Sequence, residues 1–210
     1  DAVAGVVNVI LRNSLDELSL RARLGTSTDG GGFSQQYQAA FGQQWSTGSL
    51  IAAYGFRRDK KIDAADRDFS ESLGKPYPLI PGQANHSLIL SATQSISDRV
   101  SLSIDATYNK RKFSSDLLAF GVLQHTDTED ETFAIAPTLS VAIGSTWRLS
   151  ATGVYGETTT NNFTSGYSGE TPLYADGLCY CHRLYGIEGY LEGPVGAIAG
   201  GDIRAVMGGG

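Results

Sequence analysis

In the stretch RVSLSIDATYN, residues 99–109, apolar and polar side chains alternate at every position from Val100 to Asn109. A period of two places all the apolar side chains on one face of an extended strand. Weaker versions of the same alternation recur along the chain and predict about nine strands in an all-β fold. The predicted strands lie around 18–25, 37–41, 50–56, 88–92, 99–109, 132–143, 147–156, 185–191 and 203–207.

The connections between these strands alternate between short and long. Short joints fall near 46–48, 97–98, 144–146 and 193–194, whereas long connections cover 26–33, 58–85, 113–128 and 157–183. Tight turns at one end and long loops at the other are typical of outer-membrane β-barrels. A soluble β-sandwich also has alternating strands. Aromatic side chains near the ends of the apolar faces favour the barrel, because such rings gather at membrane interfaces.

Composition limits the possible partners and membrane segments. The chain has 210 residues, a net charge of -6 and two cysteines. The basic clusters, among them Arg57-Arg58 and Lys110-Arg111-Lys112, are short, so nucleic-acid binding has little electrostatic support. No run of 18 apolar residues occurs, which excludes a spanning helix but leaves a spanning strand possible.

Two stretches of the sequence, residues 1–12 and residues 191–206, resemble motifs of TonB-dependent outer-membrane receptors. The N-terminal sequence DAVAGVVNVILR, residues 1–12, resembles the last strand of the plug domain in that family. The sequence LEGPVGAIAGGDIRAV, residues 191–206, is similar to a Gly-Pro and Gly-Gly turn with its following strand in the family barrel. The resemblance assigns residues 1–12 to the end of the plug and residues 13–210 to the N-terminal part of a transmembrane antiparallel β-barrel.

The resemblance also implies a function. Members have a barrel of 22 strands, filled by the plug, and import a scarce ligand with energy supplied by TonB. The expected partners are the TonB complex, outer-membrane lipid and a small-molecule ligand. An iron-siderophore is the commonest ligand, and other metal chelates, cobalamin or oligosaccharides are alternatives. The signal peptide and the TonB box would lie upstream of Asp1.

This interpretation makes the chain a fragment of a transporter in the bacterial outer membrane. It predicts neither enzymatic activity nor a cofactor or metal site. A passive porin-like channel and a soluble adhesion or carbohydrate-binding sandwich are the alternative functions.

Candidate ligand-binding residues lie in the mixed-charge stretch between the third and fourth predicted strands. Arg57, Arg58 and Tyr77 are the candidates, because binding residues concentrate on loops held by a rigid scaffold. The alternative is that this stretch is an ordinary solvent-exposed loop without a binding role.

Cys179 and Cys181 belong to the only sequence cluster with metal-ligand residue types, Cys179-Tyr180-Cys181-His182. A disulfide is the first interpretation, since thiols outside the cell are usually oxidised. Free thiols are the second interpretation. A zinc site is the third, because structural zinc needs four ligands and wider spacing.

Overall fold

A computed structural model of the chain describes residues 15–73, 77–199 and 201–210. The predicted plug strand at residues 1–12 lies outside the described residues. The described chain is almost entirely β-structure, with two short 3-10 turns as its only helical elements.

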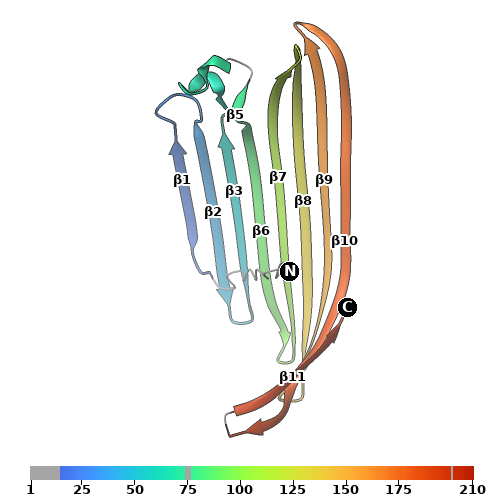
Figure 1. Cartoon of the computed structure of the whole chain (residues 1–210). Helices are drawn as coiled ribbons and strands as arrows, with labels where there is room; N and C mark the ends of the chain where they lie inside the picture. The colour runs from blue at the N-terminus through green and yellow to red at the C-terminus, as the bar shows by residue number, and fades with distance from the viewer. Residues whose placement is uncertain (1–14, 74–76, 200) are drawn as a thin grey trace.

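Nine strands form one antiparallel sheet in the order β1-β2-β3-β6-β7-β8-β9-β10-β11 (Figure 1). Its strands are β1 (Leu18–Gly25), β2 (Ser34–Trp45), β3 (Gly48–Asp59), β6 (Gly82–Ser97), β7 (Val100–Ala119), β8 (Val122–Ile143), β9 (Trp147–Ser168), β10 (Thr171–Ile198) and β11 (Gly201–Gly209). Each of the nine predicted segments lies in a different one of these strands, so the predicted all-β fold is confirmed.

Three of the four predicted short joints are confirmed, and the fourth is wrong. Gly193 and Pro194 lie inside β10, and the chain turns between Ile198 and Gly201 instead. The pairing of β10 with β11 shifts between Pro194 and Gly196, which is a β-bulge. A bulge accommodates a proline that cannot donate a ladder hydrogen bond, so Gly-Pro marks an irregular strand here and not its end.

The predicted long loops at 113–128 and 157–183 are also wrong. Strands β7 and β8 continue to Ala119 and Val122 and are joined by Phe120 and Gly121. Strands β9 and β10 continue to Ser168 and Thr171. The parts of these strands nearest the insertion stay paired, because opposite charges and threonines lie opposite one another there.

The turn that joins β7 to β8 is tight and bears an unusual residue. Phe120 has φ 52° and Gly121 has φ 79°. Positive φ at both central residues is the geometry of a type I′ hairpin turn, in which Asn and Gly are the usual residues. Phe120 is fully exposed at this tip.

The connection between β3 and β6 folds into a small insertion. It contains β4 (Ile62–Asp63), the 3-10 turns η1 (Ala64–Asp66) and η2 (Glu71–Leu73), and β5 (Pro78–Ile80), which pairs with β4. The insertion lies at the end of the sheet where the β1–β2 loop and the β7–β8 hairpin also lie (Figure 1). The guanidinium of Arg67 donates hydrogen bonds to the carbonyl oxygens of Asp29 and Gly30 and to the Ser27 hydroxyl, which ties the insertion to the β1–β2 loop.

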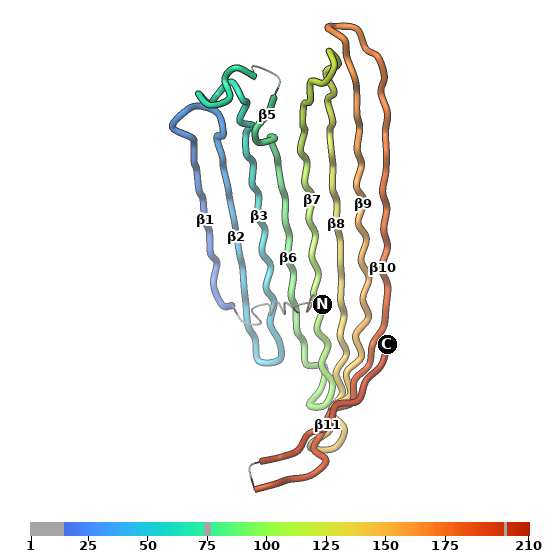
Figure 2. Tube along the Cα trace, viewed as in Figure 1, coloured from blue at the N-terminus to red at the C-terminus, as the bar shows by residue number. Residues whose placement is uncertain are grey.

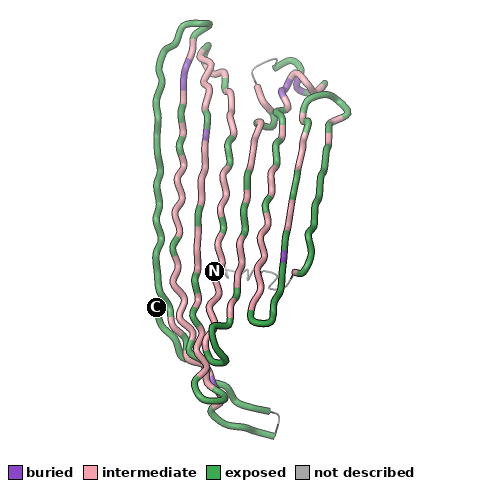
Figure 3. The backbone as a smooth tube through the Cα atoms, turned by 180° about the vertical axis from the view of Figure 1, so that it is seen from behind, coloured by how far each residue is buried: buried purple, intermediate pink, exposed green. Residues whose placement is uncertain are grey.

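The large sheet is a single layer (Figure 2). Within the described chain, Ala64 of the insertion is the only buried apolar residue. Large apolar side chains of the sheet remain exposed, with Leu20 at 72% and Ile187 at 73%, and most of the sheet is coloured as intermediate or exposed in Figure 3. The described residues therefore do not form the two packed sheets of the sandwich alternative.

Candidate functional site

One face of the sheet, here called the apolar face, carries the side chains that share an orientation with Ile104. Residues directly opposite in an antiparallel ladder point to the same face, as do alternate residues of one strand. The pairing places Ala92 of β6 and Pro137 of β8 beside Ile104 on this face. The central part of this face in β1 to β10 carries no charged side chain. Its residues are Leu18, Leu20, Ala22, Ala39, Phe41, Leu50, Ala52, Leu88, Leu90, Ala92, Leu102, Ile104, Ala106, Ile135, Pro137, Leu139, Val141, Leu149, Ala151, Gly153, Ile187, Gly189 and Leu191.

Aromatic rings border this apolar band at both ends. On the side toward the insertion they are Tyr37, Tyr54, Phe56, Tyr108, Phe133, Tyr155 and Tyr185, and at the opposite end they are Trp45 and Trp147. The Tyr108 hydroxyl donates to Glu131 at 3.1 Å and the Tyr155 hydroxyl donates to Glu157 at 2.7 Å. The tyrosine rings thus adjoin the apolar band while their hydroxyl groups contact charged residues beyond it.

The height of the band can be compared with a membrane. The apolar positions of β7 extend from Val100 to Tyr108, and Lys110 follows on the same face. The nine residues from Val100 to Tyr108 span about 27 Å along the strand, which at a tilt of about 40° is a height of about 20 Å. This height approaches the roughly 25 Å of the outward apolar band of outer-membrane barrels.

The other face, here called the polar face, is rich in hydroxyl groups. Four hydroxyl pairs form hydrogen bonds between β8 and β9. They are Thr126–Thr164 at 3.2 Å, Thr132–Thr158 at 3.3 Å, Thr138–Thr152 at 2.9 Å and Ser140–Ser150 at 3.1 Å. Asp105 also lies on this face and accepts a hydrogen bond from Ser91 at 2.6 Å. Such a surface suits water and not hydrocarbon.

Beyond the aromatic border the apolar face becomes charged. Lys110 contacts Glu129 at 2.5 Å and Glu131 at 3.3 Å, and Lys112 also pairs with Glu129. Hydrogen bonds from Lys110 and Lys112 lower the pKa of Glu129, and those from Glu129 and Glu131 raise the pKa of Lys110. We call Lys110, Lys112, Glu129 and Glu131 the charged ladder.

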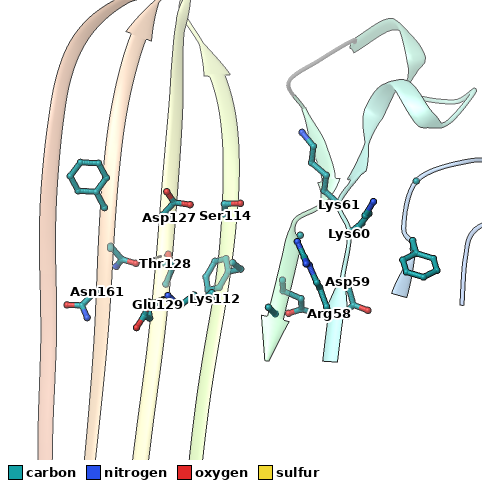
Figure 4. Close-up of a pocket in the computed structure, with 18 of the residues that line it drawn as sticks. Arg58, Asp59, Lys60, Lys61, Lys112, Ser114, Asp127, Thr128, Glu129 and Asn161 are labelled. Atoms are coloured by element: carbon teal, nitrogen blue, oxygen red, sulfur yellow. Dashed lines mark hydrogen bonds and ion pairs between the residues drawn. The ribbon is translucent and has the colours of Figure 1, made fainter. Parts of the chain in front are cut away.

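A hollow of about 1110 Å³ lies at this charged end of the sheet (Figure 4). Strands β3, β6, β7, β8, β9 and β10 line it, together with Phe33 of the β1–β2 loop. A single row of paired residues on the polar face runs through its lining. The row comprises Asp59, Gln83, Phe113, Thr128, Asn162 and Leu178. Amide, hydroxyl and carboxylate groups next to an aromatic ring give the hollow the features of a small-molecule site.

The structure does not bring the three predicted ligand-binding residues together. Arg57 and Arg58 lie at the end of β3 and not in the loop, and as neighbours in a strand they point to opposite faces. Arg57 forms an ion pair with Asp59 at 2.8 Å, whereas Arg58 lines the hollow. Tyr77 donates a hydrogen bond to the carbonyl oxygen of Leu118 at 2.8 Å and anchors the insertion on β7. Ligand binding by these residues remains a prediction.

Several residues of the hollow were missed because residues 113–128 were interpreted as a loop. Phe113 lies 4.7 Å below the guanidinium of Arg111, which also forms an ion pair with Asp130 at 3.1 Å. A sequence signal was present, because three basic residues at 110–112 and three acidic residues at 129–131 lie equally far from Phe120-Gly121. Opposite charges in mirror positions indicate a paired hairpin.

A histidine lies between two carboxylates close to the tip of the same hairpin. His125 Nδ1 is 2.5 Å from Asp116 Oδ1, and its Nε2 is 3.3 Å from Asp127 Oδ2. The hydrogen bond with Asp116 is the main reason that the pKa of His125 is raised. Asp116 also lies 3.9 Å from Lys61 of the insertion.

Cys179 and Cys181 lie in β10 and not in the predicted loop. Both are exposed free thiols, and their Sγ atoms are 2.8 Å apart. The disulfide stays a prediction. Across the described ranges, no group of three or more His, Cys, Asp or Glu side chains is arranged to hold a metal ion.

Comparisons with models of known protein families and with curated protein sequences gave no match. In the part of the chain that the structure describes, no helix has both the length and the apolar character needed to cross a membrane.

Proposed function

We propose that the chain forms part of the wall of a transmembrane β-barrel in a bacterial outer membrane and belongs to an energy-coupled receptor that imports a scarce small molecule. The observation that supports the barrel most is the uncharged band of the apolar face, bordered by aromatic rings at both ends. Lipid would cover this band, and the ladder hydrogen bonds of the sheet would satisfy the backbone within the hydrocarbon.

The polar face supports an aqueous interior. In the proposed barrel, the hydroxyl pairs of β8 and β9 and the carboxylate of Asp105 would face water or a plug domain. The hollow beside Phe113 would lie near the outer end, where an incoming ligand arrives first. The insertion and the β1–β2 loop, which Arg67 joins, would flank the entrance.

The TonB dependence of the proposal rests on the two sequence motifs. The motif at 191–206 lies in β10 and β11, where Gly193 and Pro194 lie at the bulge and the Ile198–Gly201 connection forms the turn. The ligand that fits the family expectation best is a ferric siderophore. A plug that moves under TonB control would open the path through the barrel.

Site-directed spin labelling tests the membrane assignment. In protein reconstituted in lipid vesicles, with Cys179 and Cys181 replaced by serine, a nitroxide is attached at Leu139→Cys or at Thr138→Cys. These neighbours point to opposite faces. We expect the label at 139 to collide mainly with oxygen dissolved in lipid, and the label at 138 mainly with a water-soluble nickel complex. Protection of position 139 from both reagents would show that protein covers the apolar face, and would overturn the proposal.

Uptake measurements test the transport function. Cells that produce the full protein are given a panel of radioactive ferric siderophores, with TonB intact or deleted. We expect accumulation of at least one complex that requires both the protein and TonB. Accumulation independent of TonB would indicate a passive channel, and no accumulation of any complex would contradict iron import.

A further inference from the structure

The two thiols of β10 share one face of the strand. Cys179 lies opposite Asn161 and Cys181 lies opposite Thr159 in the ladder with β9. Alternate residues of a strand point the same way, so the two sulfur atoms stand side by side, 2.8 Å apart. Tyr180 and His182 point to the opposite face.

The surroundings leave this pair open to small reagents. Both cysteines are exposed. Arg183, two residues after Cys181 on the same face, forms an ion pair with Glu157 at 3.1 Å.

The geometry of the pair favours a ligand that needs only two sulfur atoms. Within the described residues no third His, Cys, Asp or Glu side chain is grouped with the two thiols to build a zinc site, and the hydrogen bond between the sulfur atoms raises the pKa of Cys179. Trivalent arsenic reacts with two thiols without an oxidant. An organic arsenoxide and two S–H groups form two As–S bonds, and the arsenic-bound oxygen leaves as water with the two thiol protons.

We propose that the reduced Cys179–Cys181 pair is a chelating site for trivalent arsenic compounds. Cys179 is also one of the residues that line the hollow, but chelation by the pair does not depend on the proposed transport function. If the barrel assignment is correct, the pair lies on the outer wall beyond the aromatic border, where the external medium reaches it.

Phenylarsine oxide provides the test. The full protein is reduced, freed of reductant and titrated with the reagent, and binding is followed by intact mass spectrometry and by loss of free thiols. We expect one phenylarsine group per chain, simultaneous loss of both thiols, and release by a dithiol but not by a monothiol at equal concentration. Incorporation of two groups, or of none, would overturn the proposal.

Moving one thiol provides a matched control. Cys181→Ser removes the chelate, and we expect the affinity to fall at least about 100-fold because the second As–S bond is no longer intramolecular. Cys181→Ser combined with His182→Cys restores two thiols but places them on opposite faces, and we expect the same loss. Equal binding by this shifted pair would show that the strand geometry is irrelevant and would overturn the proposal. Unchanged amide exchange in β9 and β10 would show that each variant retains the fold.

Discussion

Strand β7 presents two different surfaces on either side of Tyr108, although its side chains alternate throughout. Before Tyr108, one face carries Leu102 and Ile104 and the other carries Ser103 and Asp105. From Lys110 to Lys112, directly after the aromatic border, both faces carry charge, with Lys110 and Lys112 on one and Arg111 on the other. The same change occurs on the neighbouring strands, at the aromatic border. The comparison shows that a strand forms wherever its backbone and side chains find partners on the neighbouring strand. The polarity of the side chains on each face, in contrast, indicates which surroundings that face suits.

The largest expected effect comes from a charge in the apolar part. Ile104→Arg puts a guanidinium at the middle of the band, and we expect it to lower the free energy of unfolding in lipid vesicles by about 2 to 4 kcal/mol. Ser103→Arg lies at nearly the same height on the polar face and should have a much smaller effect. Chemical unfolding titrations of the full protein in vesicles measure both.

Ile104→Phe distinguishes lipid from a protein partner on that face. Lipid accommodates the larger ring, whereas a close-packed interface resists it by about 1 to 3 kcal/mol. If Ile104→Phe lowers the free energy of unfolding as much as Ile104→Arg does, protein and not lipid covers the apolar face.

The next effect concerns the turn at the tip of the charged part. Phe120 adopts positive φ at a position where asparagine is favoured, so Phe120→Asn should stabilise the hairpin by about 1 kcal/mol. Gly121→Ala should have the opposite effect, because φ is also positive there and alanine tolerates that conformation poorly. The added Cβ meets no atom within 4 Å, so the cost comes from the backbone conformation and not from a steric clash. Amide hydrogen exchange across β7 and β8 measures both changes. Identical exchange in the two variants would contradict the assigned turn.

A smaller effect is expected in the charged ladder. Glu129→Lys places a third cation beside Lys110 and Lys112, and should speed amide exchange in the upper parts of β7 and β8 several-fold at low salt. Adding Lys112→Glu restores one opposite-charge pair and should reverse most of the change. Exchange in the lower part, around Ile104, should stay constant. If amide exchange changed equally along the whole of β7 and β8, the charged part and the apolar part of these strands would not be separate in stability, and the comparison would be wrong.

The smallest expected effect is a pH dependence at His125. Its pKa is raised in the folded chain, so the stabilisation by Asp116 and Asp127 is complete below pH 6.5 and is lost as pH rises through the folded pKa. After correction for intrinsic exchange, the tip of the β7–β8 hairpin should be better protected at pH 5.5 than at pH 8.5. His125→Gln should remove that difference. Persistence of the difference in His125→Gln would assign it to another group.

Prediction from the sequence succeeded where one strand carries its own signal. The alternation around Leu102 and Ile104 locates β7, and similar patterns locate the other eight strands. It failed at residues 113–128, at residues 157–183 and at Gly193-Pro194. Polar residues and Gly-Pro pairs are common in loops, so these stretches look like loops when read alone. Only the opposing strand shows that they are paired. The hollow was missed for the same reason, since Phe113, Thr128 and Asn162 come together from three strands.

The sequence by itself therefore determined the number of strands in the sheet, the division of their central parts into an apolar and a polar face, and the positions of three turns. These features follow from local alternation and local turn chemistry. Only the tertiary structure decided how far β7 to β10 extend, where β10 turns, and that Arg57 and Arg58 point to opposite faces beside different partners. Register and cross-strand pairing depend on residues far apart in the chain, because each ladder hydrogen bond and each ion pair needs a partner from another strand.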